Sequence, residues 1–336
     1  MRVMAWIVSI RSCVLLAVCL GCSPRGDEGP PEGSASPKLV AAKGVVGVSV
    51  MTLTNPFFMV IADNLRKELA PHGYTIDLHS AESDAAKQQN QVKDFIVKKC
   101  AAIVLNPKDS MAIGPAIVEA NRAGIPVFTV DIRCLDPTAK VVAHVGTDNY
   151  GGGKLAGKAL IEALGESGGK VVLLDHEVAE STIERERGFK EVIEAHNRSG
   201  KSGKIELVAE LPCGGARDVG YRSTEDAIQS HPDIVGIFAV NDPAALGARA
   251  ALEKAGKADQ VVIIGFDGQP EGKKAVRDGK IYADPIQYPD KMGVETGRAI
   301  IKYFKGEEVA PRLDIPTSLY RQADAEKDPE INDGAG

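Results

Sequence analysis

The chain has 336 residues, 40 lysines and arginines against 46 aspartates and glutamates, and a formal net charge of -6. This length allows two domains of ordinary size, each with its own core. The acidic balance and the lack of a long basic block argue against nucleic acid as a partner. A content of 44% hydrophobic but only 5% aromatic residues excludes a disordered or disulfide-dense chain.

The N-terminus has the layout of a secretion signal. Arg2 and Arg11 precede an apolar run from 13 to 20 that is too short to span a membrane. Gly21 directly before Cys22 resembles the bacterial lipoprotein cleavage site, so Cys22 is predicted to carry a lipid; a plain cleaved signal is the alternative. We therefore expect a signal peptide over 1–22, a flexible Gly/Pro/Ser-rich tether over 23–43, and a protein of the periplasm or cell envelope that is held at a membrane only by its lipid.

Ten short apolar runs rich in Val and Ile then alternate with segments of helical period. The runs are 44–50, 74–79, 101–106, 126–131, 141–146, 170–175, 205–211, 234–240, 261–266 and 281–286. Continuous apolar strands separated by helices are typical of a parallel sheet covered on both faces. A break near residues 147 and 148, after the fifth run, divides the pattern into two similar lobes. The predicted fold class is α/β, with two doubly wound parallel-sheet lobes.

Capping signals predict several helix starts. Asn55 and Asp242 are each followed by proline, which predicts an N-cap at both positions. Ser181 and Glu184 have the spacing of a capping box. The glycine run 151–153 lacks the spacing of a phosphate loop and is better explained by close packing of backbone.

Three cysteines remain outside the leader: Cys100, Cys134 and Cys213. An odd number leaves at least one free thiol. Cys100 precedes an apolar run, so we expect it to be buried and inert. Whether Cys134 and Cys213 form a disulfide is left open.

Polar and aromatic residues follow the strands where ligands bind in open α/β sheets. They are Asn55, Phe57, Phe58, Asn106, Asp131, Asp175, His176, Asn241, Asp242 and Asp267. Carboxylates accept hydrogen bonds from hydroxyls, amides both donate and accept, and an aromatic ring suits the C–H face of a sugar. The pattern predicts a small polyhydroxylated ligand, a sugar or polyol, between the two lobes.

Arg185 supports this prediction. If Ser181 caps its helix, Arg185 lies in the first full turn, where the helix dipole disfavours a cation by about 0.3–1 kcal/mol. Arg185 also lies four residues before the core residue Phe189, on the same side of the helix. A cation placed there is expected to find its partner in the cleft.

The same residues have alternative roles. Asn55 is an N-cap, a ligand contact or both, whereas Asp242 is assigned to capping. Asp175 and His176 are adjacent in an extended strand and point to opposite faces, so they do not form a catalytic pair. Because no Cys/His cluster has metal-ligand spacing and no nucleophile motif is present, the sequence predicts no enzyme, no metal and no cofactor.

Six motifs occur in an order that resembles a known family. They are TNPFF at 54–58, LNPKDS at 105–110, RERGF at 185–189, FAVNDPAALG at 238–247, GFDG at 265–268 and QYPDKMG at 287–293. In these stretches the chain resembles the periplasmic sugar-binding proteins of the ribose-binding type, which share their fold with the effector domains of lactose-repressor-like regulators. The resemblance extends from about residue 44 to about residue 320.

The resemblance implies a periplasmic binding protein fold of type I with a three-segment hinge near residues 147–148, 287 and 316. The implied division is an N-terminal lobe of 44–147 plus 288–316, a C-terminal lobe of 148–287 plus 317–325, and a disordered tail of 326–336. The implied pocket consists of Asn55, Phe57, Phe58, Asn106, Asp131, Arg185, Asn241, Asp267 and Gln287. Alanine at Asp267 or at Arg185 is expected to weaken binding more than about tenfold without unfolding the protein.

The implied function is that of a monomeric substrate-binding component of a sugar ABC importer, which meets permease and ATPase subunits. Presentation of the ligand to a membrane sensor or chemoreceptor is the alternative. A regulator's effector domain is disfavoured because a secretion signal stands where a DNA-binding module would be. Ile132 follows Asp131 where ribose binders have arginine, with Arg133 one place later, and Gly215 falls where an aromatic is expected. These departures leave the identity of the sugar open.

Overall fold

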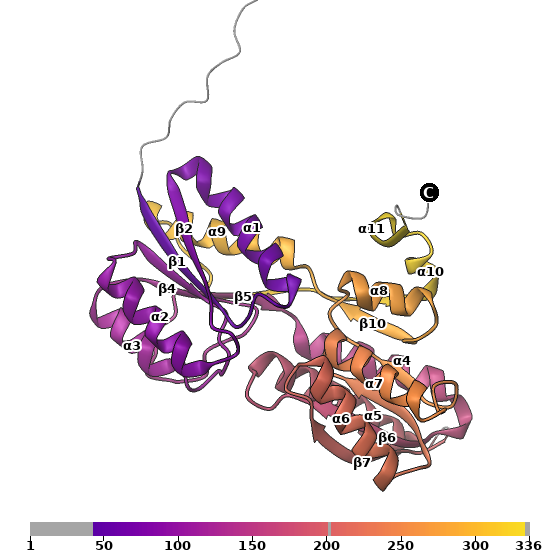
Figure 1. Cartoon of the computed structure of the whole chain (residues 1–336). Coiled ribbons are helices and arrows are strands. Elements are labelled where there is room, and N and C mark those ends of the chain that lie inside the picture. Colours follow the sequence, from indigo (N-terminus) through magenta and orange to yellow (C-terminus); the bar gives the residue numbers. More distant parts are fainter. Residues whose placement is uncertain (1–42, 201–202, 333–336) are drawn as a thin grey trace, which may run out of the picture. The chain divides into compact units, whose positions relative to one another are not determined.

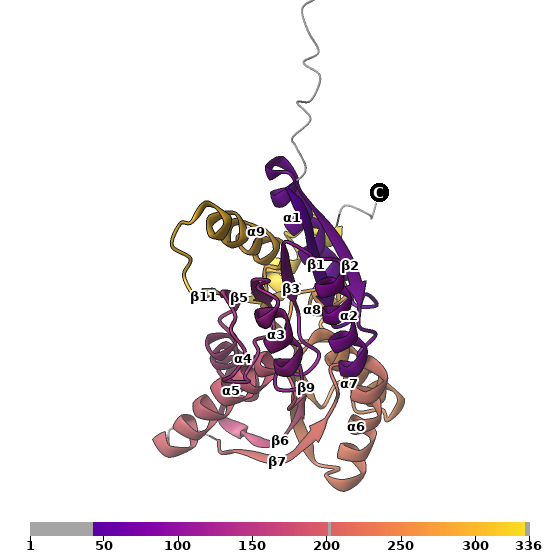
Figure 2. The same cartoon turned by 90° about the vertical axis from the view of Figure 1, so that its left-hand side faces the viewer.

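The computed structural model describes residues 43–200 and 203–332 (Figures 1 and 2). The predicted signal peptide, the predicted lipidation site Cys22 and the predicted tether up to residue 42 lie outside the described residues. Within the described ranges, no helix combines the length and the hydropathy that crossing a membrane requires.

The strands form two sheets of six. The first sheet has the order β11 (Arg312–Ile315), β5 (Ala143–Thr147), β4 (Val127–Val130), β3 (Ala102–Leu105), β1 (Gly44–Val50), β2 (Tyr74–Ser80), and all its strands are parallel. The second has the order β12 (Ser318–Arg321), β10 (Ala283–Ile286), β9 (Val262–Ile264), β8 (Ile234–Ala239), β6 (Gly169–Asp175), β7 (Ile205–Pro212), with only β12 antiparallel to its neighbour. All ten predicted runs contain strands, and the predicted fold class is confirmed.

Strands β11 and β12 were not predicted. Each has four residues and lies at the edge of its sheet, and β11 exposes three of its four residues. Edge strands of this kind lack the continuous apolar run that reveals a central strand. The two strands matter for connectivity, because the chain passes between the sheets after β5, after β10 and again after β11.

Helices cover both faces of the first sheet. Helices α1 (Pro56–Leu69) and α9 (Pro289–Lys305) pack side by side on one face, and α2 (Ala85–Val97) and α3 (Gly114–Arg122) lie on the other (Figures 1 and 2). The cap of α1 is as predicted, because Asn55 Oδ1 accepts the Phe57 N–H at 3.0 Å. The predicted apolar stripe of α1 is buried in the core.

The second sheet is covered by α4 (Asn149–Leu164), α5 (Glu180–Ser199), α6 (Arg217–Ser230), α7 (Asp242–Lys254) and α8 (Pro270–Arg277). Helices α4 and α5 cross at glycines. A Cβ on Gly153 would lie 1.9 Å from the carbonyl oxygen of Arg185, and one on Gly188 would lie 2.1 Å from that of Tyr150. The predicted close packing at the glycine run is therefore confirmed.

Two predicted caps are wrong. Helix α5 begins at Glu180, so Ser181 lies inside its first turn and makes no side-chain cap. The cap of α7 is Asn241, whose Oδ1 accepts the Ala244 N–H at 3.0 Å. Asp242 is instead buried, because its carboxyl turns toward the neighbouring 267–269 turn.

The cysteines and the C-terminal segment can also be compared with the predictions. Cys134 and Cys213 do not form a disulfide; Cys100 and Cys213 are buried thiols, and Cys134 is half-buried. Within the tail of 326–336 that was expected to be disordered, residues Pro329–Asn332 form the short helix α11, which follows α10 (Gln322–Ala325). Residues 333–336 lie outside the described residues. The side chain of Ile331 anchors α11 in the hydrophobic core of the second sheet, and this burial supplies the free energy that orders the segment.

Candidate functional site

A cavity of about 560 Å³ lies where residues from the two sheets approach each other. Its walls include Asn55, Phe57, Phe58 and Asp131 from the first sheet's part of the chain, and Arg185, Asn241, Asp267 and Gln287 from the second part. These are eight of the nine residues that the resemblance implied. The volume lies within the range of small-molecule sites, about 300–1,000 Å³.

Asn106 is the exception, because it is fully buried behind the wall. Its Nδ2 donates to Asp131 Oδ2 at 2.9 Å, and its Oδ1 accepts the Met51 N–H at 3.1 Å. Asn106 therefore orients Asp131 and does not itself line the cavity.

Asp131 presents a poorly compensated carboxyl to the cavity. Its backbone has φ of 64°, a conformation that costs free energy in a non-glycine residue and recurs at functional sites. Asn106 holds Oδ2, whereas Oδ1 has no hydrogen-bond partner among the described residues. Burial raises the pKa of Asp131 to about 7; the Arg185 charge lowers it and the Asp267 charge raises it further. A ligand hydroxyl would supply the missing donor.

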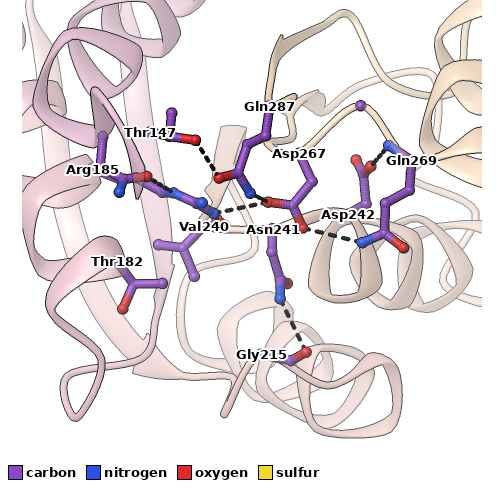
Figure 3. Close-up of polar contacts among 12 residues, drawn as sticks. Thr147, Thr182, Arg185, Gly215, Val240, Asn241, Asp242, Asp267, Gln269 and Gln287 are labelled. Atoms are coloured by element: carbon purple, nitrogen blue, oxygen red, sulfur yellow. Dashed lines mark hydrogen bonds and ion pairs between the residues drawn. The ribbon is translucent and has the colours of Figure 1, made fainter. Parts of the chain in front are cut away.

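Arg185 lies in a buried network at the opposite wall (Figure 3). Its Nη1 donates to Val240 O at 2.6 Å and to Asp267 Oδ1 at 3.0 Å, and its Nε donates to Asn149 Oδ1 at 2.9 Å. The guanidinium lies 3.8 Å from the ring centroid of Phe266, a cation–π contact. Its Nη2 has no partner among the described residues, so two N–H donors remain for a ligand.

Asp267 is held by two amides beside Arg185. Gln287 Nε2 donates to Asp267 Oδ1 at 2.6 Å, and Gln269 Nε2 donates to Oδ2 at 3.1 Å. Gln287 Oε1 in turn accepts the Thr147 hydroxyl at 2.7 Å, so one amide joins Asp267 to the end of β5 (Figure 3). Burial raises the pKa of Asp267, while Arg185 and the two amides lower it. The network fixes this carboxylate in one orientation.

The remaining predicted residues line the cavity and also have a structural role, in the core or as helix caps. Phe57 and Phe58 pack edge to face, with ring centroids 5.4 Å apart, and belong to the core while lining the cavity. Asn55 uses Oδ1 as a cap and keeps Nδ2 without a partner in the described part of the chain. Asn241 uses Oδ1 as a cap and Nδ2 to hold Gly215 O at 3.0 Å (Figure 3).

The cavity also contains residues that sequence reasoning did not assign to it. They are, among others, Thr182, Gln269, Ile132 and Gly214. His176, one of the strand-end residues but not of the implied pocket, also lines the cavity; it is buried, and its Nε2 lies 3.1 Å from Lys108 Nζ. Burial lowers the pKa of His176 to about 4, so the imidazole is neutral at pH 7. Its position directly after β6 was the sequence feature that indicated a place at the cavity.

Comparisons with known proteins agree with this geometry. Residues 46–308 match the family model described as periplasmic binding protein domain. The chain belongs to the periplasmic binding protein family. It is 37% identical to the ribose import binding protein of Salmonella typhimurium over 83% of this chain and 90% of that protein. It is 32% identical to the D-apiose import binding protein of Paraburkholderia graminis over 85% and 90% of the two chains. A solute-binding protein from Agrobacterium vitis with bound D-fucose is 30% identical, with a TM-score of 0.77 over 86% and 98% of the chains.

Two positions where this periplasmic binding protein departs from the pattern that the resemblance implied lie at the cavity. Ile132 lines the cavity, and Arg133 instead pairs with Glu180 at 2.9 Å. Gly215 has φ of 69°, and a Cβ there would lie 3.1 Å from Asn241 Nδ2. One wall is therefore bare backbone, and another is apolar where a guanidinium was expected.

A group of three carboxylates includes Asp175, the last residue of β6. Oxygens of Asp175, Glu186 and Glu210 lie within 4.8 Å of one another. Lys190 Nζ lies 2.6 Å from Glu210 and 3.8 Å from Glu186, so a side chain already supplies positive charge. Burial, and then the Asp175 charge, raises the pKa of Glu186 to about 7.

Glutamine at Glu186 is expected to stabilise the protein at about pH 8. A raised carboxyl pKa means that the stability due to protonated Glu186 is fully present below about pH 4.5 and is lost as the pH rises through about 7. Glutamine removes this loss, a gain of order 1–2 kcal/mol that corresponds to a few degrees in Tm. Thermal unfolding at about pH 5 and about pH 8 measures it, with exposed Glu194→Gln as the control. Equal melting temperatures of variant and wild type at the higher pH would contradict the assignment.

Proposed function

We propose that this protein is the substrate-binding component of a sugar ABC importer and that its cavity holds one small monosaccharide or polyol. The observation that carries the proposal is the convergence of Asp131, from the first sheet, with Arg185 and Asp267, from the second, on one cavity. The import binding proteins for ribose and D-apiose and the D-fucose-bound protein named above support the same class of ligand.

The chemistry of the walls suits a neutral ligand with several hydroxyls. Asp131 and Asp267 accept hydrogen bonds, the free N–H groups of Arg185 donate, and the free Nδ2 of Asn55 donates. Phe57 offers a ring for the C–H face of the sugar. We assign ligand contact to Asn55, Phe57, Phe58, Asp131, Arg185, Asn241, Asp267 and Gln287, and a supporting role to Asn106.

Ligand that bridges the two lobes stabilises a closed form over an open one, because only the closed form makes both sets of contacts. We assign residues 44–147 with 288–316 to one lobe and 148–287 with 317–325 to the other. The monomeric closed form would be recognised by permease and ATPase subunits, and the protein itself would not alter the sugar. Recognition by a membrane sensor is the second candidate; transport assays in cells that lack this chain distinguish the two.

The primary test is a thermal-shift screen of pentoses, hexoses and polyols, D-ribose, D-apiose and D-fucose included. A ligand that binds only the native state raises the melting temperature. At a ligand concentration of 100 times the dissociation constant, the native state is stabilised by about 2.7 kcal/mol. Gly215 offers only backbone and Ile132 offers an apolar side chain, so the pattern of ribose binders does not predict the preferred sugar. The screen ranks the sugars by affinity. A flat response to every sugar and polyol would refute the proposal.

Asparagine at Asp131 is expected to weaken binding of the best sugar more than about tenfold. Asparagine keeps the shape of the side chain but replaces a carboxylate, which accepts from two hydroxyls, by an amide. Titration calorimetry measures the change, and Asp94→Asn, an exposed position on α2, is the matched control. Equal affinity of Asp131→Asn and wild type would remove Asp131 from the site.

We further propose that the chain is exported and that Cys22 carries its lipid. Replacing Cys22 by serine should release the protein from membranes into the soluble fraction of the cell envelope, because the thiol is the site of acylation. Metabolic labelling with a fatty acid measures the modification directly. Label that persists in the Cys22→Ser variant would overturn this assignment.

A further inference from the structure

Two buried aspartates next to the cavity have no role in the proposed ligand contacts. Asp242 is the first residue of α7 and Asp284 lies in β10; they are 1% and 0% exposed. Their carboxyl groups lie close together, because a Cβ on Gly265 would lie 3.3 Å from Asp242 Oδ1 and 3.4 Å from Asp284 Oδ1. Neither Oδ1 has a hydrogen-bond partner in the described part of the chain. An ionised carboxylate can only accept, so a proton held between the two groups would give both oxygens a partner.

The outer oxygens of the pair hold the turn that carries Asp267. Asp242 Oδ2 accepts the Gln269 N–H at 2.7 Å (Figure 3), and Asp284 Oδ2 accepts the Gly268 N–H at 3.1 Å. Asp267 has φ of 125°, a conformation that L side chains rarely adopt and that persists only when the surroundings enforce it. The two backbone N–H groups that follow Asp267 are the points where the pair enforces it.

Few other groups act on the pair electrostatically. The Asp267 carboxylate adds negative charge and the Arg185 guanidinium adds positive charge. Helix α8 packs against Asp242 at Gly272, where a Cβ would lie 2.3 Å from Asp242 Oδ1. Burial, and next the charge of Asp284, raises the pKa of Asp242 well above its usual value. Burial also raises the pKa of Asp284, to about 7.

We propose that Asp242 and Asp284 share one proton and act together as positioning residues for Asp267. This inference rests on the proposed function, since Asp267 is one of the assigned ligand contacts. The shared proton joins the two carboxyl groups, the pair holds the 267–269 turn, and the turn presents Asp267 to Arg185, Gln287 and the sugar. When the proton is lost, two buried like charges lie in contact and the turn is released. Ligand affinity therefore falls as the pH rises.

Asparagine provides matched variants. In Asp284→Asn the amide oxygen accepts the Gly268 N–H, while the NH2 group donates to Asp242 and replaces the shared proton. Asp242→Asn does the same from the other side. The double variant places two NH2 groups against each other, so it should bind at least about tenfold more weakly than either single variant. Asp284→Ala removes the hold on Gly268 and should also bind at least about tenfold more weakly at neutral pH.

The experiment measures D-ribose binding by calorimetry and urea unfolding without sugar, at about pH 7 and about pH 9.5. Wild type should lose at least about tenfold in affinity at the higher pH, and Asp284→Asn less than about threefold. The urea concentration at the unfolding midpoint should also fall further between the two pH values in wild type than in Asp284→Asn.

Two results would overturn the inference: equal pH dependence of wild type and Asp284→Asn, or unchanged D-ribose affinity in Asp284→Ala. If wild type binds no D-ribose at either pH, then D-ribose is not the sugar of the proposed function. The unfolding comparison, which needs no ligand, still decides whether the proton is shared.

Discussion

Alanine at Arg185 is expected to lower the free energy of unfolding by about 3–5 kcal/mol and to reduce sugar affinity more than about 100-fold. The side chain is 3% exposed and pairs with a buried Asp267 at 3.0 Å. Removing the guanidinium leaves the Asp267 carboxylate buried without its countercharge, and it also removes the free Nη2 donors. The sequence-based expectation was weaker binding without unfolding, and the buried ion pair adds an expected loss of stability to it.

Urea unfolding and titration calorimetry separate the two effects. Arg187→Ala, on the same helix but 62% exposed, is the control and should change neither quantity. In the double variant Arg185→Ala/Asp267→Asn the uncompensated charge is gone, so much of the lost stability should return while sugar binding stays absent. A single Arg185→Ala variant with wild-type stability and affinity would show that the buried pair has neither role.

Alanine at Gly153 is expected to destabilise the protein by about 3 kcal/mol, the upper end for overpacking. Helix propensity alone predicts the opposite, a gain of about 1 kcal/mol for alanine over glycine in a helix. The clash dominates because the added Cβ would lie 1.9 Å from a backbone carbonyl, that of Arg185, and a backbone atom cannot turn aside as a side chain can. Helix α5 must shift, and it carries Arg185, so sugar affinity should fall as well.

Lys158→Ala is the control for this variant, because Lys158 lies on the same helix and is exposed. Thermal unfolding of both variants, followed by calorimetry with the best sugar, gives the comparison. A Gly153→Ala protein more stable than wild type would mean that propensity outweighs packing at this crossing and that α4 and α5 can separate without cost.

The residues that line the cavity were predictable from sequence to the extent that strand ends are. Asp131 and Asp267 each follow a central strand, and the carboxyl edge of an open sheet is where such residues gather. Asn106 satisfied the same rule but lies behind the wall, because its amide is used by Asp131 and Met51. Sequence position cannot distinguish a residue that faces a ligand from one that supports it.

Asp242 shows the reverse error. A proline after an aspartate is a sound capping signal, yet the preceding Asn241 provides the cap and frees Asp242 to pair with Asp284, more than 40 residues away in the chain. The helix start was predicted within one residue, and the role of the side chain was not.

The sequence by itself determined the α/β class, ten of the strands and several wall residues that follow strands, because hydrophobic periodicity and strand ends are local properties of the chain. Only the tertiary structure decided which buried charges are paired, which glycines allow α4 and α5 to touch, and which two aspartates are buried close together. These properties depend on contacts between segments distant in the chain, and burial changes the free energy of a charged group in a way that no local pattern records.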